Sequence, residues 1–411
     1  MIKEENLPEN YELVKLGDVL SSITNGTTST QNEEDNGYRV TRIETIANGE
    51  IDLKRTNFVE LNKEKYDKFK LNEGDILFSH INSTKHIGKT AIYHSEMGTL
   101  IHGMNLLRLV PKKEIISPKF LLYLLKNKKT RAFYQTRCKR AVNQSSLDQK
   151  TIKKFEFILP PLKTQQKIVE ILEKAEKLKE WRAETDVLTN EYLKSLFLEM
   201  FGHTGINPKK WPLMKATDIC SKEKNAIKAG PFGSSLKKEF YVEKGYKIYG
   251  QEQVIKDDLS YGNYYIPEEI YKKLQNCKIK EGDILISLVG SYGKISIVPK
   301  EFEPGIINPR LMKISLNQKI VSPLFFRFLL NSDGIKKKIE HVSHGGTMNI
   351  INVKIIKQLD FPIPPIQLQN QFAEIVQNVE QLKEEQKQSK AQIDNLFNAL
   401  MQKAFKGELT C

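Results

Sequence analysis

The chain has 411 residues, of which 39% are hydrophobic and 28% charged, a balance that supports folded cores and excludes a disordered chain. One hydrophobic core rarely extends over this length, so we expect at least two domains. The 64 Lys and Arg residues exceed the 50 Asp and Glu residues, and the net charge of +14 favours nucleic acid as a partner over an anionic membrane. No segment approaches the ~18 apolar residues of a membrane span. The first residues contain no apolar signal-peptide core. We therefore expect a cytoplasmic protein without a membrane partner.

An internal repeat organises the chain. The segment Pro8–Val19 resembles Pro208–Ile219, at an offset of 200 (208 − 8). Later, Leu159–Leu162 (Leu-Pro-Pro-Leu) recurs as Ile363–Ile366 (Ile-Pro-Pro-Ile), at an offset of 204 (363 − 159). From there the offset stays constant to the end of each repeat. The loops of the two halves therefore differ in length, whereas the segments after the two Pro-Pro pairs do not.

A long helix is predicted after each Pro-Pro pair, over 164–201 and 368–405, because proline is tolerated before a first turn and none interrupts the following pattern. Apolar residues recur at alternating three- and four-residue steps, which indicates a coiled-coil seam. A polar layer lies near the middle of each helix at matching positions and would fix the register. The predicted seam residues are Ile168, Ile171, Leu178, Arg182, Thr185, Tyr192, Leu196, Phe372, Ile375, Leu382, Gln386, Ser389, Ile393, Leu396 and Leu400.

The two helices are predicted to pair with each other in antiparallel orientation. The matched polar layers would also align in parallel packing. Antiparallel packing is preferred because a pseudo-two-fold axis perpendicular to the helices would then place the globular domains at opposite ends, facing the same way. Each globular part mixes short β-like runs with apolar helical stretches, so the fold class is α+β. The expected division is 1–158 for the first domain, 159–203 for the first helix, 204–361 for the second domain and 362–411 for the second helix.

This doubled order of α+β domain, Pro-Pro segment and long helix resembles the specificity subunit of Type I restriction-modification enzymes. The helix ends Phe197–Gly202 and Ala404–Leu409 are similar to helix ends in that family. The segments Val142–Leu147 and Gly345–Ile350 are also similar. The resemblance covers nearly the whole chain. It implies two target-recognition domains that each read one half of a split DNA sequence, with a coiled coil that sets their spacing.

The resemblance also implies partners. Two methyltransferase (modification) subunits would bind along the helices and use S-adenosylmethionine, and motor-nuclease (restriction) subunits would join them for DNA cleavage. Those activities would belong to other chains. The resemblance thus implies a non-catalytic subunit with no cofactor of its own.

We expect the DNA contacts in polar loops, because base edges require short bidentate side chains and phosphates require cations. Four loops stand out, over 79–89 and 137–144 in the first domain and over 290–294 and 341–349 in the second. The candidate base readers are Asn143, Gln144, Gln251, Gln253 and Arg310, and the candidate phosphate contacts include Lys89, Lys139 and Lys294. The complete set of candidate DNA-binding residues is Asn82, Thr84, Lys85, Lys89, Lys139, Arg140, Asn143, Gln144, Gln251, Gln253, Ser291, Tyr292, Lys294, Arg310, His344, Thr347 and Asn349.

Motifs for chemistry within the chain are weak. The sequence contains neither the Asn/Asp-Pro-Pro-aromatic loop of an adenine methyltransferase nor a glycine-rich cofactor turn. Gly88-Lys89-Thr90 imitates the end of a phosphate-binding loop, but Ser83 stands where that loop requires glycine. The four cysteines form no C-x-x-C pair. Four histidines lie near one another in the sequence, but their spacing matches no zinc-ligand pattern. They are His80, His86, His94 and His102. We therefore expect no metal site.

Two alternatives stay open at this point. One is a fragment of a self-sufficient DNA methyltransferase or nuclease, against which the absent cofactor motifs argue. The other is a coiled-coil scaffold that does not bind DNA. Equal helix lengths favour a spacer, because the distance between two half-sites must be fixed whereas a generic dimerisation coil need not be duplicated. At ~1.5 Å per residue each helix would span ~55 Å, compatible with the ~34 to 36 Å repeat of B-DNA.

Overall fold

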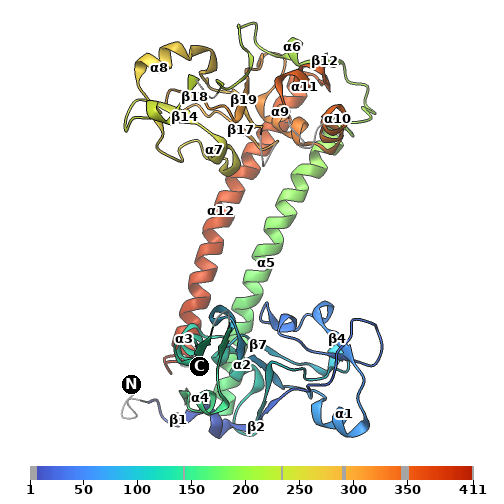
Figure 1. Ribbon diagram of the computed structural model, residues 1–411, viewed down its shortest axis with the longest axis vertical. Coiled ribbons are helices and arrows are strands. Elements are labelled where there is room, and N and C mark those ends of the chain that lie inside the picture. The colour runs from blue at the N-terminus through green and yellow to red at the C-terminus, as the bar shows by residue number, and fades with distance from the viewer. Residues whose placement is uncertain (1–6, 142–143, 233–234, 289–292, 344–350, 410–411) are drawn as a thin grey trace. The chain divides into compact units, whose positions relative to one another are not determined.

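The computed structural model describes residues 7–141, 144–232, 235–288, 293–343 and 351–409. The chain forms two compact units, the first from residues 1–183 and 388–411 and the second from 184–387. Each unit contains part of both long helices, α5 (Leu162–Phe201) and α12 (Ile366–Ala404) (Figure 1). The division cuts the helices at positions 204 apart (387 − 183), so it follows the internal repeat. The sequence-based division instead gave each helix a segment of its own.

A four-stranded antiparallel sheet forms the centre of the first unit, in the order β2 (Leu20–Asn25), β8 (Leu106–Pro111), β5 (Ile76–Ser79) and β7 (Thr90–Ile92). Residues of β5 alternate between the two faces of the sheet, as the two-residue period of a strand requires. Ile76 and Phe78 therefore enter a different hydrophobic cluster from Leu77. Both faces are covered, which explains why Ile76, Leu77 and Phe78 are all apolar.

The second unit repeats this sheet, in the order β13 (Ile227–Ala229), β19 (Leu311–Ile314), β16 (Ile284–Ser287) and β17 (Ile295–Ile297). The alternation along β16 is the same, with Ile284 and Ile286 in one cluster and Leu285 in another. The two units thus share strand order and core design, and the α+β prediction with an internal repeat is confirmed.

The remaining strands and α-helices surround each sheet. In the first unit they are β1 (Glu12–Lys15), β3 (Tyr38–Val40), β4 (Asn57–Val59), α1 (Lys63–Phe69), β6 (Ile81–Asn82), α2 (Pro118–Lys126), α3 (Lys128–Arg137), β9 (Lys139–Ala141), β10 (Gln144–Ser146), α4 (Gln149–Lys153) and β11 (Glu156–Leu159). In the second unit they are β12 (Leu213–Lys215), α6 (Ala216–Ile219), β14 (Tyr246–Tyr249), α7 (Gln251–Lys256), β15 (Tyr265–Ile266), α8 (Glu268–Lys273), β18 (Gly305–Ile307), α9 (Pro323–Asn331), α10 (Asp333–Ser343), α11 (Val353–Gln358) and β20 (Asp360–Pro362).

The long helices run antiparallel within each unit. In the first unit Lys179 of α5 forms an ion pair with Asp394 of α12, with 2.8 Å between Nζ and Oδ1. In the second unit the Gln386 side-chain amide donates to the Thr189 hydroxyl at 3.2 Å. Of these four residues, Gln386 belongs to the polar layer predicted near the middle of α12. No helix among the residues that the structure describes is long and apolar enough to cross a membrane.

Part of the predicted seam is exposed, which corrects the heptad assignment. Leu178 and Tyr192 on α5 are 41% and 51% exposed, and Leu382 and Leu396 on α12 are 46% and 48% exposed. An α-helix has 3.6 residues per turn, so a strict seven-residue pattern drifts by about 20° per heptad and rotates out of the contact over a helix this long. The predicted seam residues Ile168, Phe372 and Gln386 are buried, as are the neighbouring positions Leu172, Thr189, Leu193, Phe197, Val376 and Met401.

A buried glutamine joins the first domain to its long helix. The Gln165 side chain, on the first turn of α5, is fully buried. Its oxygen accepts the Ser117 N–H at 2.8 Å, and its nitrogen donates to the carbonyls of Ile115 and Pro160 at 3.0 and 2.8 Å. One amide thereby satisfies backbone groups that precede α2 and α5, and it ties the starts of the two helices together.

The second unit contains the same junction, 204 residues later. Gln369 is fully buried, its oxygen accepts the Ser322 N–H at 2.9 Å, and its nitrogen donates to the carbonyls of Ile320 and Pro364 at 3.0 and 2.7 Å. The two Pro-Pro segments therefore do more than begin helices. Each also presents a carbonyl to a glutamine that fixes the helix on its domain.

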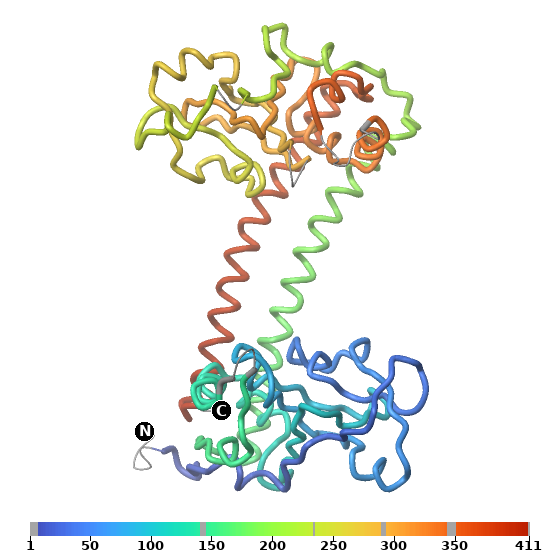
Figure 2. Tube along the Cα trace, viewed as in Figure 1, coloured from blue at the N-terminus to red at the C-terminus, as the bar shows by residue number. Residues whose placement is uncertain are grey.

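Pro8 and Gly407 approach each other in the first unit. A Cβ added to Gly407, which has a φ of +75°, would lie 3.6 Å from Cδ of Pro8. Figure 2 follows the chain through both units. At the corresponding junction in the second unit, Gly202 has a φ of +77°, and a Cβ added there would lie 2.9 Å from Cγ of Pro208. Glycine tolerates the left-handed conformation that both helix ends require. The end of each helix thus lies against the first residues of a domain in the same manner.

We predict that Gln165→Leu lowers the free energy of unfolding by about 2–4 kcal/mol, because it leaves one buried N–H and two buried carbonyls without their partner. Gln166→Leu is the matched control, since the neighbouring Gln166 is exposed on the same helix. Urea denaturation of both variants measures the difference. Equal stability of the two variants would contradict the bracing role of Gln165.

Candidate nucleic-acid interface

One end of each four-stranded sheet gathers the polar loops. In the first unit Ser79, the last residue of β5, pairs with Leu106, the first residue of β8. Asn25, the last residue of β2, pairs with Leu107. The chain therefore leaves β2 and β5 and enters β8 at the same sheet end. The register Ser287↔Leu311 creates the same arrangement in the second unit.

The hairpin after β5 closes identically in both units. The Ser79 N–H donates to the Lys89 carbonyl at 2.9 Å, and the Gly88 N–H donates back to Ser79 at 2.9 Å. In the second unit the bonds from Ser287 to Lys294 and from Gly293 to Ser287 are 3.0 and 3.1 Å long. Gly88 and Gly293 have φ values of +77° and +75°, which favour glycine. The sequence Gly88-Lys89 thus closes a hairpin, and it places Lys89 and Lys294 at equivalent positions.

The two candidate loops of the first domain meet in a small sheet. Strand β10 pairs with β6 on one side and with β9 on the other, so Ser145 lies opposite Asn82, and Ser146 lies opposite Lys139. The hydroxyl groups of Thr84 and Ser145 are 2.7 Å apart. Residues about 60 positions apart in sequence therefore share one surface. The structure places Arg140 and Gln144 in β9 and β10 without describing their side chains.

Positive groups cluster beside this surface. Arg131 of α3 donates from Nη2 to the Lys85 carbonyl at 3.2 Å, and Lys89 donates from Nζ to the Ala47 carbonyl. Burial lowers the pKa of Lys89, and the positive charges of Arg131 and Lys85 lower it further. Burial, followed by Lys89, Lys85 and Arg131, also lowers the pKa of His86. These cations repel one another, so a bound phosphate would relieve an existing electrostatic cost.

The second domain presents candidate residues at the same sheet end. Arg310, directly before β19, and Lys294, directly before β17, are exposed. Gln251 begins α7 and donates from its amide to the Ser287 hydroxyl at 2.7 Å. An amide, a guanidinium and an ammonium group are thus brought to one end of a sheet from three separate segments. This mixture suits base edges and phosphates together.

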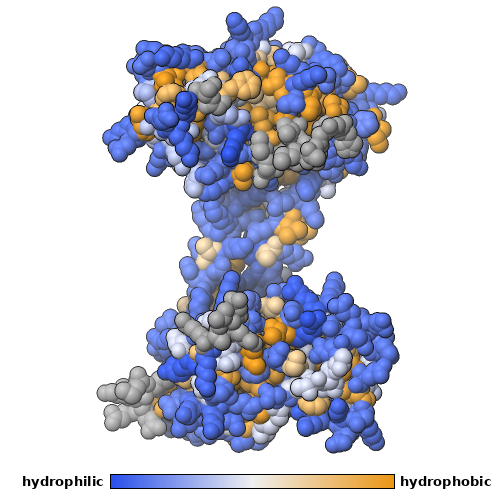
Figure 3. Space-filling model, in the orientation of Figure 1, coloured by the Kyte–Doolittle hydropathy of each residue, from blue (hydrophilic) through white to orange (hydrophobic). Residues whose placement is uncertain are grey.

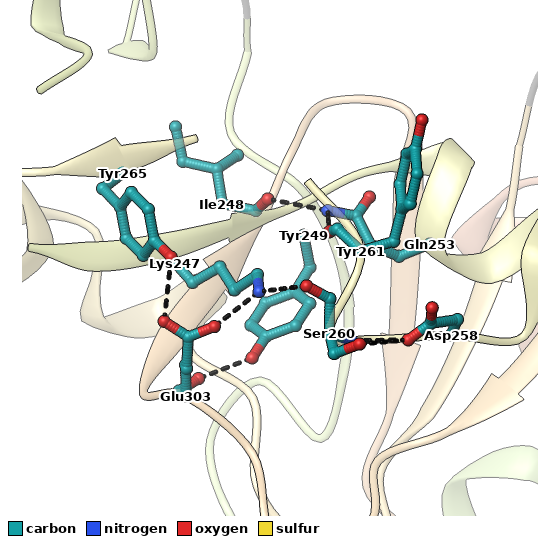
Figure 4. A network of polar contacts seen from close by, with 9 residues as sticks. All are labelled: Lys247, Ile248, Tyr249, Gln253, Asp258, Ser260, Tyr261, Tyr265 and Glu303. Carbon is teal, nitrogen blue, oxygen red and sulfur yellow. Dashed lines mark hydrogen bonds and ion pairs between the residues drawn. The ribbon is translucent and has the colours of Figure 1, made fainter. Parts of the chain in front are cut away.

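Gln253 requires a correction, because it lies in the interior and not on this surface. It is 3% exposed. Its oxygen accepts the Gly250 N–H at 3.0 Å, and its nitrogen donates to the carbonyls of Tyr261 and Ile248 at 3.0 and 3.4 Å (Figure 4). The buried side chain thus caps α7 and braces the neighbouring loop, which leaves its amide directed toward backbone groups. Sequence alone does not separate this role from that of Gln251.

Six predicted contact residues lie outside the described residues, namely Asn143, Ser291, Tyr292, His344, Thr347 and Asn349. The histidines of the first domain occupy different environments. His80 and His102 are buried, whereas His94 forms a 2.8 Å contact with Glu73. Within the described ranges, no three His, Cys, Asp or Glu side chains form a group that could hold a metal ion.

The sequence analysis did not predict a role for the loops that follow β2 and β13. A Cβ at Gly26 would lie 1.9 Å from the Gly103 carbonyl oxygen, and one at Gly230 would lie 1.9 Å from the Asn308 oxygen. Only glycine permits these close backbone approaches, which join the loop after β2 or β13 to the loop before β8 or β19. The sequence did contain a signal for these loops. Gly26 and Gly230 directly follow equivalent strands and are 204 positions apart (230 − 26), the same offset as the long helices.

Two copies of one α+β module, each with polar loops at the same sheet end, define a doubled recognition protein. The model of the Type I restriction modification DNA specificity domain matches residues 8–185 and again 208–395. The chain belongs to this family, and it is a specificity subunit of the type I restriction-modification class.

Relatives over the full length agree. A protein of Methanocaldococcus jannaschii, provisionally named the MjaX specificity subunit of a type I restriction enzyme, is 32% identical over 423 aligned positions that cover 99% of this chain and 97% of the relative. The MjaVIII specificity subunit of the same organism is 23% identical over 99% of this chain and 96% of its own length.

Solved structures share the fold. A chain from a study of complex assembly and conformational transition in the type I R-M system superposes with a TM-score of 0.66 and 17% identity, over 98% of this chain and all of that one. The HsdS subunit of Thermoanaerobacter tengcongensis gives a TM-score of 0.51 with 18% identity, over the full length of both chains.

We predict that the first domain loses stability below neutral pH because of His80 and His102. Burial lowers the pKa of each from 6.5 to about 4. Between these values the unfolded chain binds protons that the folded chain does not, so stability falls as pH falls through this window. The loss between about pH 7 and about pH 5 is about 1–2 kcal/mol per histidine. His102→Gln should reduce the loss, whereas His341→Gln, exposed on α10, should not. Chemical denaturation at both pH values measures the loss of unfolding free energy. The same loss in His102→Gln as in the unchanged protein would refute the prediction.

We predict that the double change Lys85→Ala and Lys139→Ala weakens binding to every DNA duplex alike, because both exposed lysines are expected to meet phosphates. The plot of log affinity against log salt should flatten by roughly 0.9 per lost contact. Fluorescence anisotropy with duplexes of unrelated sequence measures both effects. The control is Lys113→Ala, an exposed lysine beyond the other end of β8. A selective loss on one sequence would argue against phosphate contacts.

Proposed function

We propose that each globular domain reads one half of a bipartite DNA sequence and that this chain carries out no chemistry of its own. The observation that carries the proposal is the duplicated sheet end, where equivalent loops present Lys89 in one unit and Lys294 in the other. Loop residues differ between the two copies while the scaffold does not, as two readers of different half-sites require.

We assign the catalytic steps to partner subunits. Methyl transfer would be carried out by two methyltransferase subunits that bind S-adenosylmethionine, and DNA cleavage by motor-nuclease subunits. The names of the relatives, which call them specificity subunits, support this assignment. A self-sufficient methyltransferase or nuclease gains no support from the family, and neither does a scaffold without DNA. The complex would act in the cytoplasm, where its DNA substrate lies.

The exposed apolar residues of the long helices support two equivalent docking sites for methyltransferase subunits. Leu178 of α5 and Leu382 of α12 are 204 positions apart and are 41% and 46% exposed. Tyr192 and Leu396 form a second such pair, at 51% and 48%. Hydrophobic patches are visible between hydrophilic stretches of the helices (Figure 3). Since each helix leaves the same two positions uncovered, the chain offers one apolar stripe twice.

The long helices would also set the spacing of the half-sites. They have 40 and 39 residues, so each spans about 60 Å at ~1.5 Å per residue. Their near-equal length in both repeats is the property expected of a spacer, since domains that read fixed half-sites require a fixed separation.

A genome-wide methylation map tests the proposed function. The chain is expressed with its methyltransferase partner, and the expected result is one asymmetric bipartite sequence methylated throughout the genome. Expression of the methyltransferase without this chain is the control and should leave no such pattern. Methylation by the chain alone would favour the enzyme alternative, and a complex that methylates no bipartite sequence would refute the proposal.

The same map tests the spacer. Seven residues are inserted after Ala183 and after Lys387, which are equivalent positions in α5 and α12. The insertion lengthens each helix by ~10 Å, or about three base pairs at ~3.4 Å each. The half-sites should stay the same while the gap between them grows. An active variant with an unchanged gap would refute the spacer.

A further inference from the structure

A polar groove of about 380 Å³ opens on the first unit, apart from the residues singled out in the sequence. Its lining combines groups from four separate segments: Gln31, Arg42, Asn57, Met104 and Asn105. Two amides of asparagine, one of glutamine and a guanidinium are the side chains that form paired hydrogen bonds with purine edges. Met104 is 47% exposed and adds an apolar surface of the kind that contacts a thymine methyl group.

The groove is built by constrained backbone. A Cβ at Gly103 would lie 1.7 Å from the Thr41 carbonyl oxygen, so the segments that contain Met104 and Arg42 are held in direct contact. The Gly103 N–H donates to the Thr41 hydroxyl at 2.9 Å. Asn105 has a φ of +69°, a left-handed conformation that asparagine tolerates better than most residues. These contacts fix the lining before any ligand arrives.

The internal repeat gives the groove a counterpart. The Arg42 N–H donates to the buried Thr45 side chain at 2.8 Å, and the Gly250 N–H donates to the buried Gln253 side chain at 3.0 Å, so a backbone N–H bonded to the side chain three residues later begins each segment. Gln251 directly follows that cap in the second unit. The groove therefore occupies the position at which the second unit presents Gln251 and, before β19, Arg310.

Arg42 is oriented within the groove. Its Nη1 donates to the Asn57 side-chain oxygen at 3.1 Å, and its Nε lies 3.4 Å from a Glu44 carboxylate oxygen. The side chain is nevertheless 41% exposed. A guanidinium that is held at two nitrogens and still open to solvent is preorganised for a further bidentate contact.

We propose that this groove is the base-reading site of the first domain, whereas the cluster of Lys85, Lys89 and Arg131 holds the phosphate backbone. The inference rests on the proposed function. It assigns base reading to one surface and phosphate binding to the other. The short segment 42–47 joins the two surfaces. Arg42 lines the groove, and the Ala47 carbonyl accepts a hydrogen bond from the Lys89 ammonium group. Base identity would thus be read beside the cations that supply affinity.

The test is selection of bound duplexes from a random-sequence pool, followed by equilibrium binding. The full chain, in complex with its methyltransferase partner, is compared with Gln31→Ala, Arg42→Ala and Arg42→Lys. Each variant should lose base preference in one half of the selected sequence only. The affinity ratio between that sequence and unrelated DNA should fall roughly tenfold to a hundredfold. Arg42→Lys keeps the charge but not the planar fork, so it should lose specificity while retaining affinity for unrelated DNA.

Arg55→Ala is the matched control, since Arg55 pairs with Asp52 and does not line the groove. Gln31→Ala guards against misfolding, because it removes a partly exposed side chain. An unchanged selected sequence in the three variants overturns the groove assignment and leaves the proposed function standing. Full specificity in Arg42→Lys, or an equal loss on all DNA in Arg42→Ala, assigns Arg42 to phosphate and overturns the assignment too. A wild-type complex that selects no sequence overturns the proposed function, and the groove with it.

Discussion

The buried amides of Gln165 and Gln369 connect each recognition domain to the helix that follows it. Each amide forms hydrogen bonds with three backbone groups that directly precede two helices, one short and one long. These bonds are 2.7 to 3.0 Å long. A buried amide can meet three fixed partners in only one orientation. The direction in which each helix leaves its domain is therefore set locally, and the positions of the sheet end, its loops and the apolar stripe follow from it.

A fixed scaffold with variable loops explains how one module can serve two half-sites. Buried strands such as β5 and β16 retain their pattern because both faces are packed, so substitutions there cost stability. The loops at the sheet end pack less and can change without that cost. Two features hold the ends of these loops in place: the hairpin closures at Gly88 and Gly293, and the close backbone approaches at Gly26 and Gly230. Variation is thus confined to the tips, where bases would be read.

The long helices combine two surfaces with different tasks. One stripe, with residues such as Leu193 and Val376, is buried within a unit. Another, with Leu178 and Leu382, is exposed at equivalent positions of both helices. An apolar residue on a solvated helix costs solubility unless a partner covers it. This cost occurs at equivalent positions of both helices, and it is the observation on which the proposed docking of two methyltransferase subunits rests.

The sequence by itself determined the repeat, the α+β class and the two long helices, because these depend on periodicity and on Pro-Pro signals that act locally. The antiparallel orientation was predicted from the pseudo-two-fold symmetry of the repeat, since the matched polar layers would align in either orientation. The sequence also located the hairpin lysines Lys89 and Lys294. It could not distinguish Gln251 from Gln253, since about half a turn of helix separates the two amides and decides which one is buried. Nor could it show which apolar stripe faces the partner helix, because the drift of 3.6 against 3.5 residues per turn accumulates only along a real helix. The groove around Arg42 was decided by tertiary structure alone, because its lining comes from four segments that meet only when strand register and glycine contacts bring them together.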